Sequence, residues 1–202
     1  MRIALFGGTF DPPHRGHTAI AAAAADRFRL DTVLFAPAGR QPLKAHPAGA
    51  SFDDRLAMTR LACAEDPRFQ ASTRDAPRPD GAPNYTVDSL ISLRDQLPDA
   101  QIFNLVGADS FHDLARWHMP ERLLQLAEWI VVSRPGYLLA DPPGLTLTPA
   151  ERQRVHLLDS VHEDVAATSL RERLATGDPC DDLLVPPVLA YIRQHHLYLT
   201  GS

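Results

Sequence analysis

The chain has 202 residues, of which 45% are hydrophobic and 22% are charged, and its formal net charge is −5. These values are typical of one soluble globular domain, and the acidic balance argues against nucleic acid or an anionic membrane surface as a partner. The only two cysteines, Cys63 and Cys180, are too few for a disulfide framework and lack the spacing of metal ligands. No apolar run is long enough to span a membrane and no signal peptide precedes the first run, so we expect a cytoplasmic protein.

Short apolar runs alternate with helical patterns along most of the chain. We predict strands at residues 2–6, 32–36, 69–72, 102–106 and 129–133, with a possible sixth at 155–158. The helices predicted between them cover residues 16–27, 52–64, 86–96 and 120–126. This alternation predicts an α/β protein with a Rossmann-like, doubly wound parallel sheet of five to six strands.

The pattern changes after residue 133. Residues 138–149 are rich in proline, and two further helices are predicted at 168–176 and 186–195. No linker separates a second domain. We therefore expect one domain over residues 1–202, with a parallel-sheet core at about 1–135 and a small C-terminal helical subdomain at about 150–202.

Residues 7–17 read GGTFDPPHRGH and directly follow the first predicted strand. A strand that turns through glycines into a helix presents unpaired backbone N–H groups, which form an anion site together with the helix dipole. His14 and His17 are three residues apart and share one helix face. The pattern favours phosphoryl or nucleotidyl transfer, although a turn with merely solvated histidines is the alternative. The glycine spacing fits neither the P-loop nor the dinucleotide-binding fingerprint.

The segment from His14 to His17 resembles the T/H-x-G-H signature of the nucleotidyltransferase superfamily. More narrowly, the sequence GGTFDPPHRGH is similar to that of the bacterial nicotinate-nucleotide adenylyltransferases. Residues 165–171, VAATSLR, resemble the second superfamily signature, I-S-S-T-x-x-R, with Thr168 and Arg171 retained. Thr168 is also a candidate N-cap for the helix that follows.

Val165, Ala166 and Ala167 replace the Ile-Ser-Ser of that second signature. If the missing serine hydroxyls only supplement backbone N–H groups, activity survives with weaker ATP binding. If either hydroxyl is needed in the transition state, the protein is slow or inactive.

Other family features follow along the chain. The family has P-H-K near residue 44; in this chain Leu43 replaces the histidine and Lys44 remains. Asn84-Tyr85-Thr86 precedes a predicted helix that Thr86 could cap. Gly107-Ala108-Asp109, followed by Trp117, matches the family's G-x-D and tryptophan, and Arg134 begins its R-P-G. The closing segment at 185–199 is similar to the family's terminal helix, so the resemblance covers nearly the whole chain.

The resemblance implies transfer of adenylate from ATP to nicotinate mononucleotide, giving deamido-NAD and pyrophosphate by in-line attack without a covalent intermediate. ATP is then the co-substrate and carries Mg²⁺ with it, and no metal site on the protein is expected. The catalytic residues implied are His14, His17 and Arg171. The ATP site implied also includes Gly7, Gly8, Thr9, Phe10, Gly107, Asp109, Arg134 and Thr168. Lys44, Thr86 and Trp117 would bind the pyridine mononucleotide, with Trp117 stacked on the pyridine ring.

Two other interpretations stay open. The first is another small-molecule adenylyltransferase of the superfamily, with pantetheine phosphate or nicotinamide mononucleotide as acceptor. The second is a non-catalytic nucleotide-binding protein, which the alanines at 166 and 167 suggest. The sequence carries no pattern that sets the oligomeric state.

Overall fold

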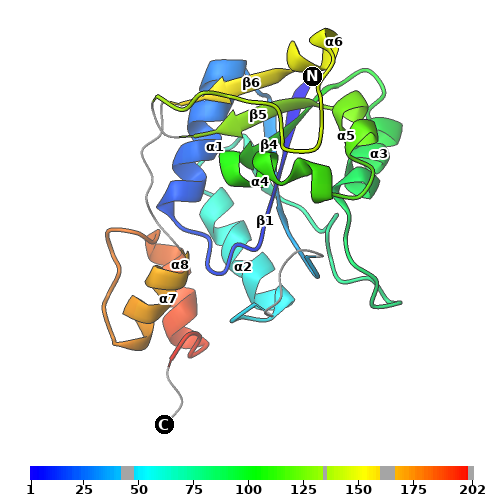
Figure 1. The fold of residues 1–202 in the computed structure, drawn as a ribbon. Coiled ribbons are helices and arrows are strands. Elements are labelled where there is room, and N and C mark those ends of the chain that lie inside the picture. Colours follow the sequence, from blue (N-terminus) through cyan, green and yellow to red (C-terminus); the bar gives the residue numbers. More distant parts are fainter. Residues whose placement is uncertain (42–47, 134–135, 160–166, 200–202) are drawn as a thin grey trace.

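The computed structural model describes residues 1–41, 48–133, 136–159 and 167–199. Within them, six parallel strands form one sheet in the order β3-β2-β1-β4-β5-β6 (Figure 1). The strands are β1 Arg2–Gly8, β2 Thr32–Pro37, β3 Phe69–Ala71, β4 Gln101–Gly107, β5 Glu128–Val132 and β6 Val155–Leu158. The predicted parallel sheet is confirmed, including its sixth strand.

The order of the strands determines where a ligand can bind. β1 lies between β2 and β4, so the chain extends the sheet from β1 first in one direction and then in the other. Ligands of open parallel sheets bind beyond the carboxyl ends of the strands at such a switch point. Here those ends are Gly8 of β1 and Gly107 of β4.

Helices cover both faces of the sheet (Figure 1). One face carries α1 Arg15–Phe28 and α2 Phe52–Cys63, and the other carries α3 Thr86–Gln96, α4 Ala108–His112, a 3₁₀ turn at Leu114–Arg116 and α5 Pro120–Leu126. A short α6, Pro149–Arg152, precedes β6, and α7 Ala167–Ala175 and α8 Pro186–Gln194 complete the described chain. The predicted helices are confirmed to within one or two residues.

Alternation along each strand builds the two halves of the core. Ile3 and Leu5 pack in the cluster beneath α3 and α5, whereas Ala4 and Phe6 pack beneath α1. This is the period-two pattern of a strand with both faces buried. The fully buried Ala24 of α1 belongs to the second cluster, and its small side chain allows the helix to approach the sheet closely.

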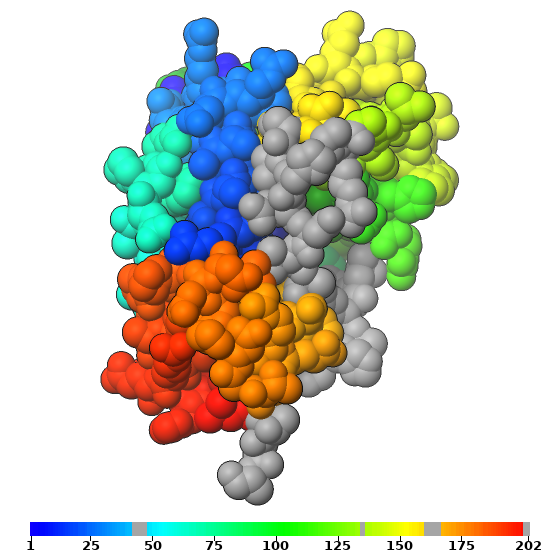
Figure 2. Space-filling model, turned by 90° about the vertical axis from the view of Figure 1, so that its left-hand side faces the viewer, coloured from blue at the N-terminus to red at the C-terminus, as the bar shows by residue number. Residues whose placement is uncertain are grey.

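The C-terminal helices form a third cluster of buried side chains with α2, which includes Met58, Leu170 and Val188. The backbone N–H of Arg15 donates to the carbonyl of Leu183 at 2.8 Å, which attaches this region to the start of α1. In the space-filling view, the C-terminal region, orange to red, lies directly against the blue N-terminal part of the chain (Figure 2). β6 belongs to the sheet, so the purely helical part of the described chain begins at α7. The division into a sheet core and a helical subdomain stays a prediction.

None of the helices in the described ranges is long and apolar enough to cross a membrane. The expected location in the cytoplasm stays a prediction.

Candidate active site

The predicted anion-binding turn connects β1 to α1. Helix α1 begins at Arg15, with His14 as its N-cap in an extended conformation, φ −138° and ψ 171°. A Cβ atom on Gly8 would lie 3.0 Å from the ring of Phe10, so a side chain at this position would require that ring to move. Phe10 has a φ of 48° and a buried ring, so it can face a ligand only through its backbone. The N-terminus of α1 therefore lies beside the carboxyl end of β1, at the switch point.

The imidazole rings of the two histidines in the turn are in contact. Their ring centroids are 3.7 Å apart with planes inclined by 33°, and the backbone N–H of His14 donates to Nδ1 of His17 at 3.2 Å. A ring nitrogen that accepts a hydrogen bond is unprotonated, so neutral His17 carries its proton on Nε2. The pair that the sequence predicts to share one helix face is therefore in contact.

His14 is held in its neutral form. Its side chain is only 6% exposed, and burial lowers its pKa to about 4. Its Nδ1 atom is buried without a hydrogen-bond partner among the described residues. A buried nitrogen without a partner is unfavourable unless a ligand forms a hydrogen bond with it, and such groups are found at binding sites.

Arg171 reaches the same turn from α7, although it is 160 residues away in the sequence. Its Nη1 donates to the carbonyl of Asp11 at 2.8 Å and its Nη2 to Oγ1 of Thr168 at 3.2 Å. The predicted capping role of Thr168 is wrong, because α7 already begins at Ala167 and Thr168 lies inside its first turn. Its hydroxyl instead accepts a bond from Arg171, which leaves further guanidinium N–H groups for an anion.

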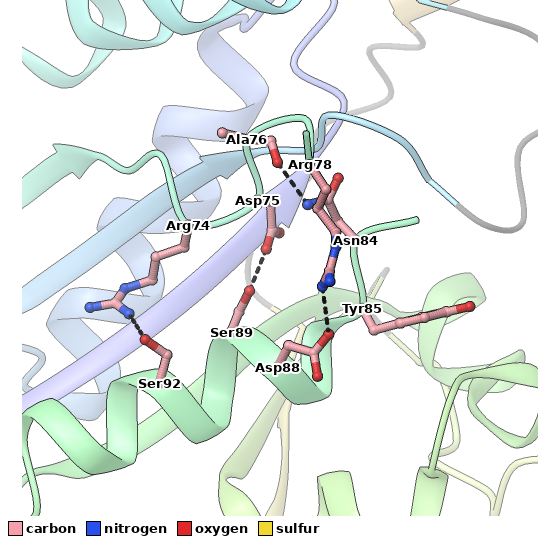
Figure 3. Close-up of a pocket in the computed structure, with 9 residues that line it drawn as sticks. All are labelled: Arg74, Asp75, Ala76, Arg78, Asn84, Tyr85, Asp88, Ser89 and Ser92. Atoms are coloured by element: carbon pink, nitrogen blue, oxygen red, sulfur yellow. Dashed lines mark hydrogen bonds and ion pairs between the residues drawn. The ribbon is translucent and has the colours of Figure 1, made fainter. Parts of the chain in front are cut away.

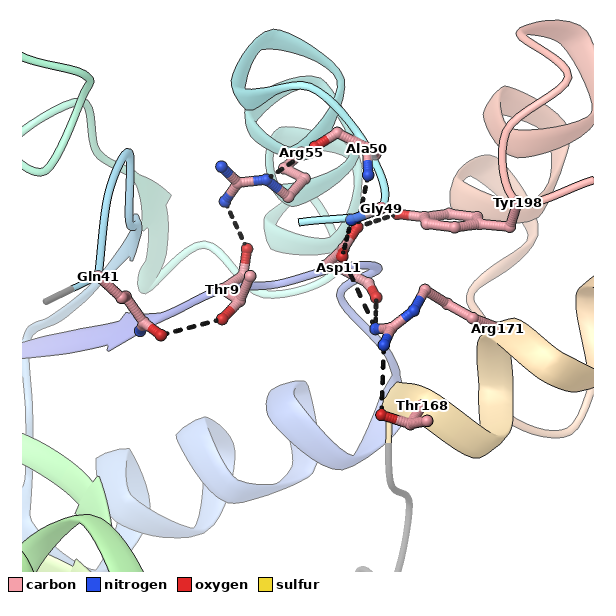
Figure 4. Close-up of polar contacts among 9 residues, drawn as sticks. All are labelled: Thr9, Asp11, Gln41, Gly49, Ala50, Arg55, Thr168, Arg171 and Tyr198. Atoms are coloured by element: carbon pink, nitrogen blue, oxygen red, sulfur yellow. Dashed lines mark hydrogen bonds and ion pairs between the residues drawn. The ribbon is translucent and has the colours of Figure 1, made fainter. Parts of the chain in front are cut away.

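The sequence did not single out Asp11 as a functional residue. Its side chain is 4% exposed and accepts from the backbone N–H of Gly49 at 2.6 Å and of Ala50 at 3.0 Å, while the hydroxyl of Tyr198 donates to it at 2.7 Å (Figure 4). Nη1 of Arg171 lies 3.7 Å from its Oδ2. One carboxylate therefore joins the turn to three other segments of the chain.

Arg55, on α2, is a second residue that the sequence did not reveal. It is 2% exposed, and its Nη1 donates to the carbonyl of Thr9 at 2.7 Å. Burial lowers its pKa. From sequence alone, an arginine within a helix is expected on the exposed face, so the burial of Arg55 becomes visible only in the folded structure.

The predicted pyridine-binding residues lie at the start of α3 and after the 3₁₀ turn. Thr86 is the first residue of α3 and Tyr85 is its N-cap, so the expected capping by Thr86 is wrong. Trp117 is half-buried and packs edge-on against the core residue Trp129, with centroids 6.0 Å apart. The rings of Tyr85 and His118 lie 4.4 Å apart, and this contact brings the two segments together.

The carboxyl end of β4 carries the remaining predicted ATP-side residues. Gly107 is the N-cap of α4 and Asp109 lies in its first turn, and both are exposed. Within the part of the chain that the structure describes, no atom lies within 4 Å of a Cβ built on Gly107. Lys44 and Arg134 lie outside the described residues, as do Val165 and Ala166.

A pocket of about 260 Å³ lies between α3 and the segment that leads to it (Figure 3). Its walls include Asp75, which bonds to the hydroxyl of Ser89 and whose pKa is raised by burial, and Arg74, whose Nη1 donates to Ser92 at 2.9 Å. These polar groups form hydrogen bonds with one another. None of the residues that line this pocket is a predicted site residue, although Tyr85 in its wall directly precedes Thr86.

A doubly wound parallel sheet with two stacked histidines, a helix N-terminus and an arginine at its switch point defines a nucleotide-binding α/β protein equipped for phosphate chemistry. The family model described as cytidylyltransferase-like matches residues 5–173. A protein of Roseiflexus sp. (strain RS-1) named "Probable nicotinate-nucleotide adenylyltransferase" is 43% identical over 196 residues, which covers 97% of each chain. A Streptomyces coelicolor protein with the same name is 41% identical over 192 residues, 95% of this chain and 98% of its own.

Among solved structures, the Plasmodium falciparum nicotinic acid mononucleotide adenylyltransferase complexed with NaAD superposes with a TM-score of 0.74 at 15% identity, covering 98% of this chain and 97% of its own. This likeness confirms the fold. The chain belongs to the nicotinate-nucleotide adenylyltransferases of the cytidylyltransferase-like family.

Proposed function

We propose that the protein transfers the adenylyl group of ATP to nicotinate mononucleotide, forming deamido-NAD and releasing pyrophosphate. The observation that carries this proposal is the stacked pair of His14 and His17 beside the N-terminus of α1. It occurs in a chain about 40% identical over nearly its full length to nicotinate-nucleotide adenylyltransferases.

The reaction needs no nucleophile from the protein. A phosphate oxygen of nicotinate mononucleotide attacks the α-phosphorus of ATP, and the bond from that phosphorus to the bridging oxygen of pyrophosphate breaks. The attacking phosphate is already an anion at neutral pH, so catalysis rests on alignment and on neutralising the charge that grows on the α-phosphate. We assign two donors to that phosphate, the Nε2–H of His17 and the imidazole of His14, whose Nδ1 has no partner among the described residues.

The leaving group would be held on the other side of the turn. Arg171 and Thr168, at the N-terminal end of α7, are assigned to the β- and γ-phosphates, because a guanidinium offers paired donors to phosphate oxygens. Ala167 lacks a hydroxyl, but as the first residue of α7 it still contributes a backbone N–H to the N-terminal end of the helix. Lys44 and Arg134 are assigned to phosphate positioning by the family resemblance alone.

The acceptor substrate, nicotinate mononucleotide, would lie at the N-terminal end of α3. Thr86 and the N–H groups of its first turn would receive the carboxylate of the nicotinate ring, and the half-buried indole of Trp117 would stack on that ring. Gly107 and Asp109, exposed at the end of β4, are assigned to the ATP ribose. Mg²⁺ would enter with ATP, coordinated by the polyphosphate oxygens and water.

The test is a pyrophosphate-release assay with ATP and Mg²⁺, with nicotinate mononucleotide, nicotinamide mononucleotide and phosphopantetheine compared as acceptors. We expect turnover of about 1 s⁻¹ or more with the nicotinate compound, and much slower release with the other two. Preference for another acceptor would overturn the substrate assignment and keep the reaction class. Bound ATP with no release from any acceptor would indicate the non-catalytic alternative and implicate the two alanines.

A further inference from the structure

The side chain of Tyr198 reaches the active-site turn from the end of the described chain. Its hydroxyl donates to Oδ1 of Asp11 at 2.7 Å, across 187 residues of sequence. Burial raises the pKa of Tyr198 above its ordinary value, so the hydroxyl is protonated and acts as a donor at neutral pH. Asp11 is almost fully buried, so this bond is shielded from water.

The backbone turns sharply between the end of α8 and this contact. Helix α8 ends at Gln194, and both His196 and Tyr198 then adopt left-handed conformations, with φ of 53° and 62°. Such conformations are unfavourable for residues with a Cβ atom and persist where surrounding contacts enforce them. At His196 the conformation belongs to the C-terminal cap of α8, where the N–H of Leu197 donates to the carbonyl of Ile192 at 3.0 Å. At Tyr198 the bond to Asp11 is such a contact.

The carboxylate of Asp11 has two different sides. Oδ1 receives the hydroxyl of Tyr198 and the N–H of Ala50, whereas Oδ2 receives the N–H of Gly49 and faces Nη1 of Arg171 at 3.7 Å. The bonds to Oδ1 set the rotation of the carboxylate, and this rotation decides where Oδ2 lies. The position of Oδ2 in turn sets the field at the guanidinium of Arg171.

These groups are packed together without spare room. A Cβ atom on Gly49 would lie 3.3 Å from Cδ of Arg171, 3.3 Å from Cε1 of Tyr198 and 3.4 Å from Oδ2 of Asp11 (Figure 4). The stem of Arg171 and the ring of Tyr198 therefore flank the same backbone position. In such close packing, a shift of the Tyr198 ring changes the space available to the side chain of Arg171 and displaces the carboxylate of Asp11 between them.

We propose that Tyr198 is a positioning residue for adenylyl transfer, which acts through Asp11 to place the guanidinium of Arg171 for the β- and γ-phosphates of ATP. This inference rests on the proposed function, because it takes the role of Arg171 from it. Tyr198 touches no substrate in this scheme. Its contribution passes through one carboxylate, and Arg55 supports the turn separately, at the carbonyl of Thr9.

The test compares Tyr198→Phe with a matched control, Tyr191→Phe. The hydroxyl of Tyr191 also donates to a carboxylate, Oδ1 of Asp54 at 3.0 Å, but this bond joins α8 to α2 away from the turn. We expect Tyr198→Phe to weaken ATP binding and to lower kcat/KM for ATP by about tenfold, the lower end for a hydrogen bond to a charged group. The KM for nicotinate mononucleotide should stay within twofold of wild type, and Tyr191→Phe should leave all three values within twofold.

A double-mutant cycle with Arg171→Ala separates positioning from a general loss of structure. If Tyr198 acts through Arg171, the effect of Tyr198→Phe should shrink to less than twofold in the Arg171→Ala background. A full tenfold effect there would overturn the inference, as would wild-type values for Tyr198→Phe. If Tyr198→Phe fails to fold, Tyr198→Leu replaces it in the same cycle, because leucine also lacks the hydroxyl that donates to Asp11.

Calorimetric titration with ATP alone keeps the two proposals distinct. Wild-type protein that binds ATP without turnover on any acceptor contradicts the proposed function, while the ATP dissociation constants of the variants still decide the role of Tyr198. Turnover in wild type together with additive variants overturns only the role of Tyr198. Wild-type protein that neither binds ATP nor turns over overturns both.

Discussion

The buried imidazole of His14 makes the stability of the protein depend on pH. Its pKa is lowered to about 4 from an ordinary value of 6.5, because burial disfavours the charged form. Between these values the unfolded chain binds a proton that the folded chain does not. Stability from this group is therefore complete above pH 6.5 and is lost as the pH falls toward 4.

The magnitude follows from the size of the shift. A difference of this size corresponds to about 3 kcal/mol, which is lost in full once the pH falls below both pKa values. At pH 5 the same two pKa values give a loss of about 2 kcal/mol. This is a substantial share of the 5–15 kcal/mol that is typical of a folded domain, roughly enough to shift a urea midpoint visibly.

Urea unfolding of wild type and His14→Gln at pH 7.5 and 5.0 measures this loss. Wild type should lose about 2 kcal/mol more than the variant between the two pH values, because every other group titrates in both proteins. His112→Gln, which removes an exposed imidazole, is the control and should behave as wild type does. Equal losses in wild type and His14→Gln would refute the burial argument.

Three further predictions concern the site and its supports. His17→Ala should lose roughly 10²–10³ in turnover, the scale for one transition-state donor, in the pyrophosphate assay; a loss below threefold with intact folding would remove His17 from the mechanism. Trp117→Ala should raise the KM for nicotinate mononucleotide by roughly 2- to 10-fold, the worth of one stacked ring, and leave the KM for ATP unchanged; equal changes in both would argue against stacking. A Cβ on Gly39 would lie 2.5 Å from the backbone nitrogen of Pro77. Gly39→Ala should therefore cost about 1–3 kcal/mol in urea unfolding, and a cost near zero would show that the loop yields.

The sheet and the longer helices could be predicted because their signals are local. Each strand is a short apolar run between turn residues, and α1, α2 and α3 each carry several turns of helical pattern. The short helices α4 and α6 were not predicted, since one turn is too brief for a 3.6-residue repeat to show. The α/β class and the parallel sheet then follow from the alternation of strands and helices along the chain.

The sequence predicted the proximity of candidate side chains within one continuous segment, whereas its predictions of helix caps were wrong; the roles of the site residues stay predictions. His14 and His17 lie in one run of sequence, so their contact follows from spacing alone. Thr86 and Thr168 have the side chains that favour an N-cap, yet α3 begins one residue earlier than that role requires and α7 begins two residues earlier. Capping preference is statistical, and the tertiary position of the helix decides where it begins.

The supports of the turn could not be found from sequence, because they connect distant segments. Asp11 lies 38 residues from Gly49 and 187 from Tyr198, and no local pattern joins such positions. Yet these contacts orient the predicted motif. A trans peptide points its carbonyl and the following N–H in opposite directions, so the bond from Arg55 to the carbonyl of Thr9 directs the N–H of Phe10 away from Arg55. With its ring buried, that N–H is the only donor that Phe10 can offer an anion, and a buried arginine outside the motif controls its direction.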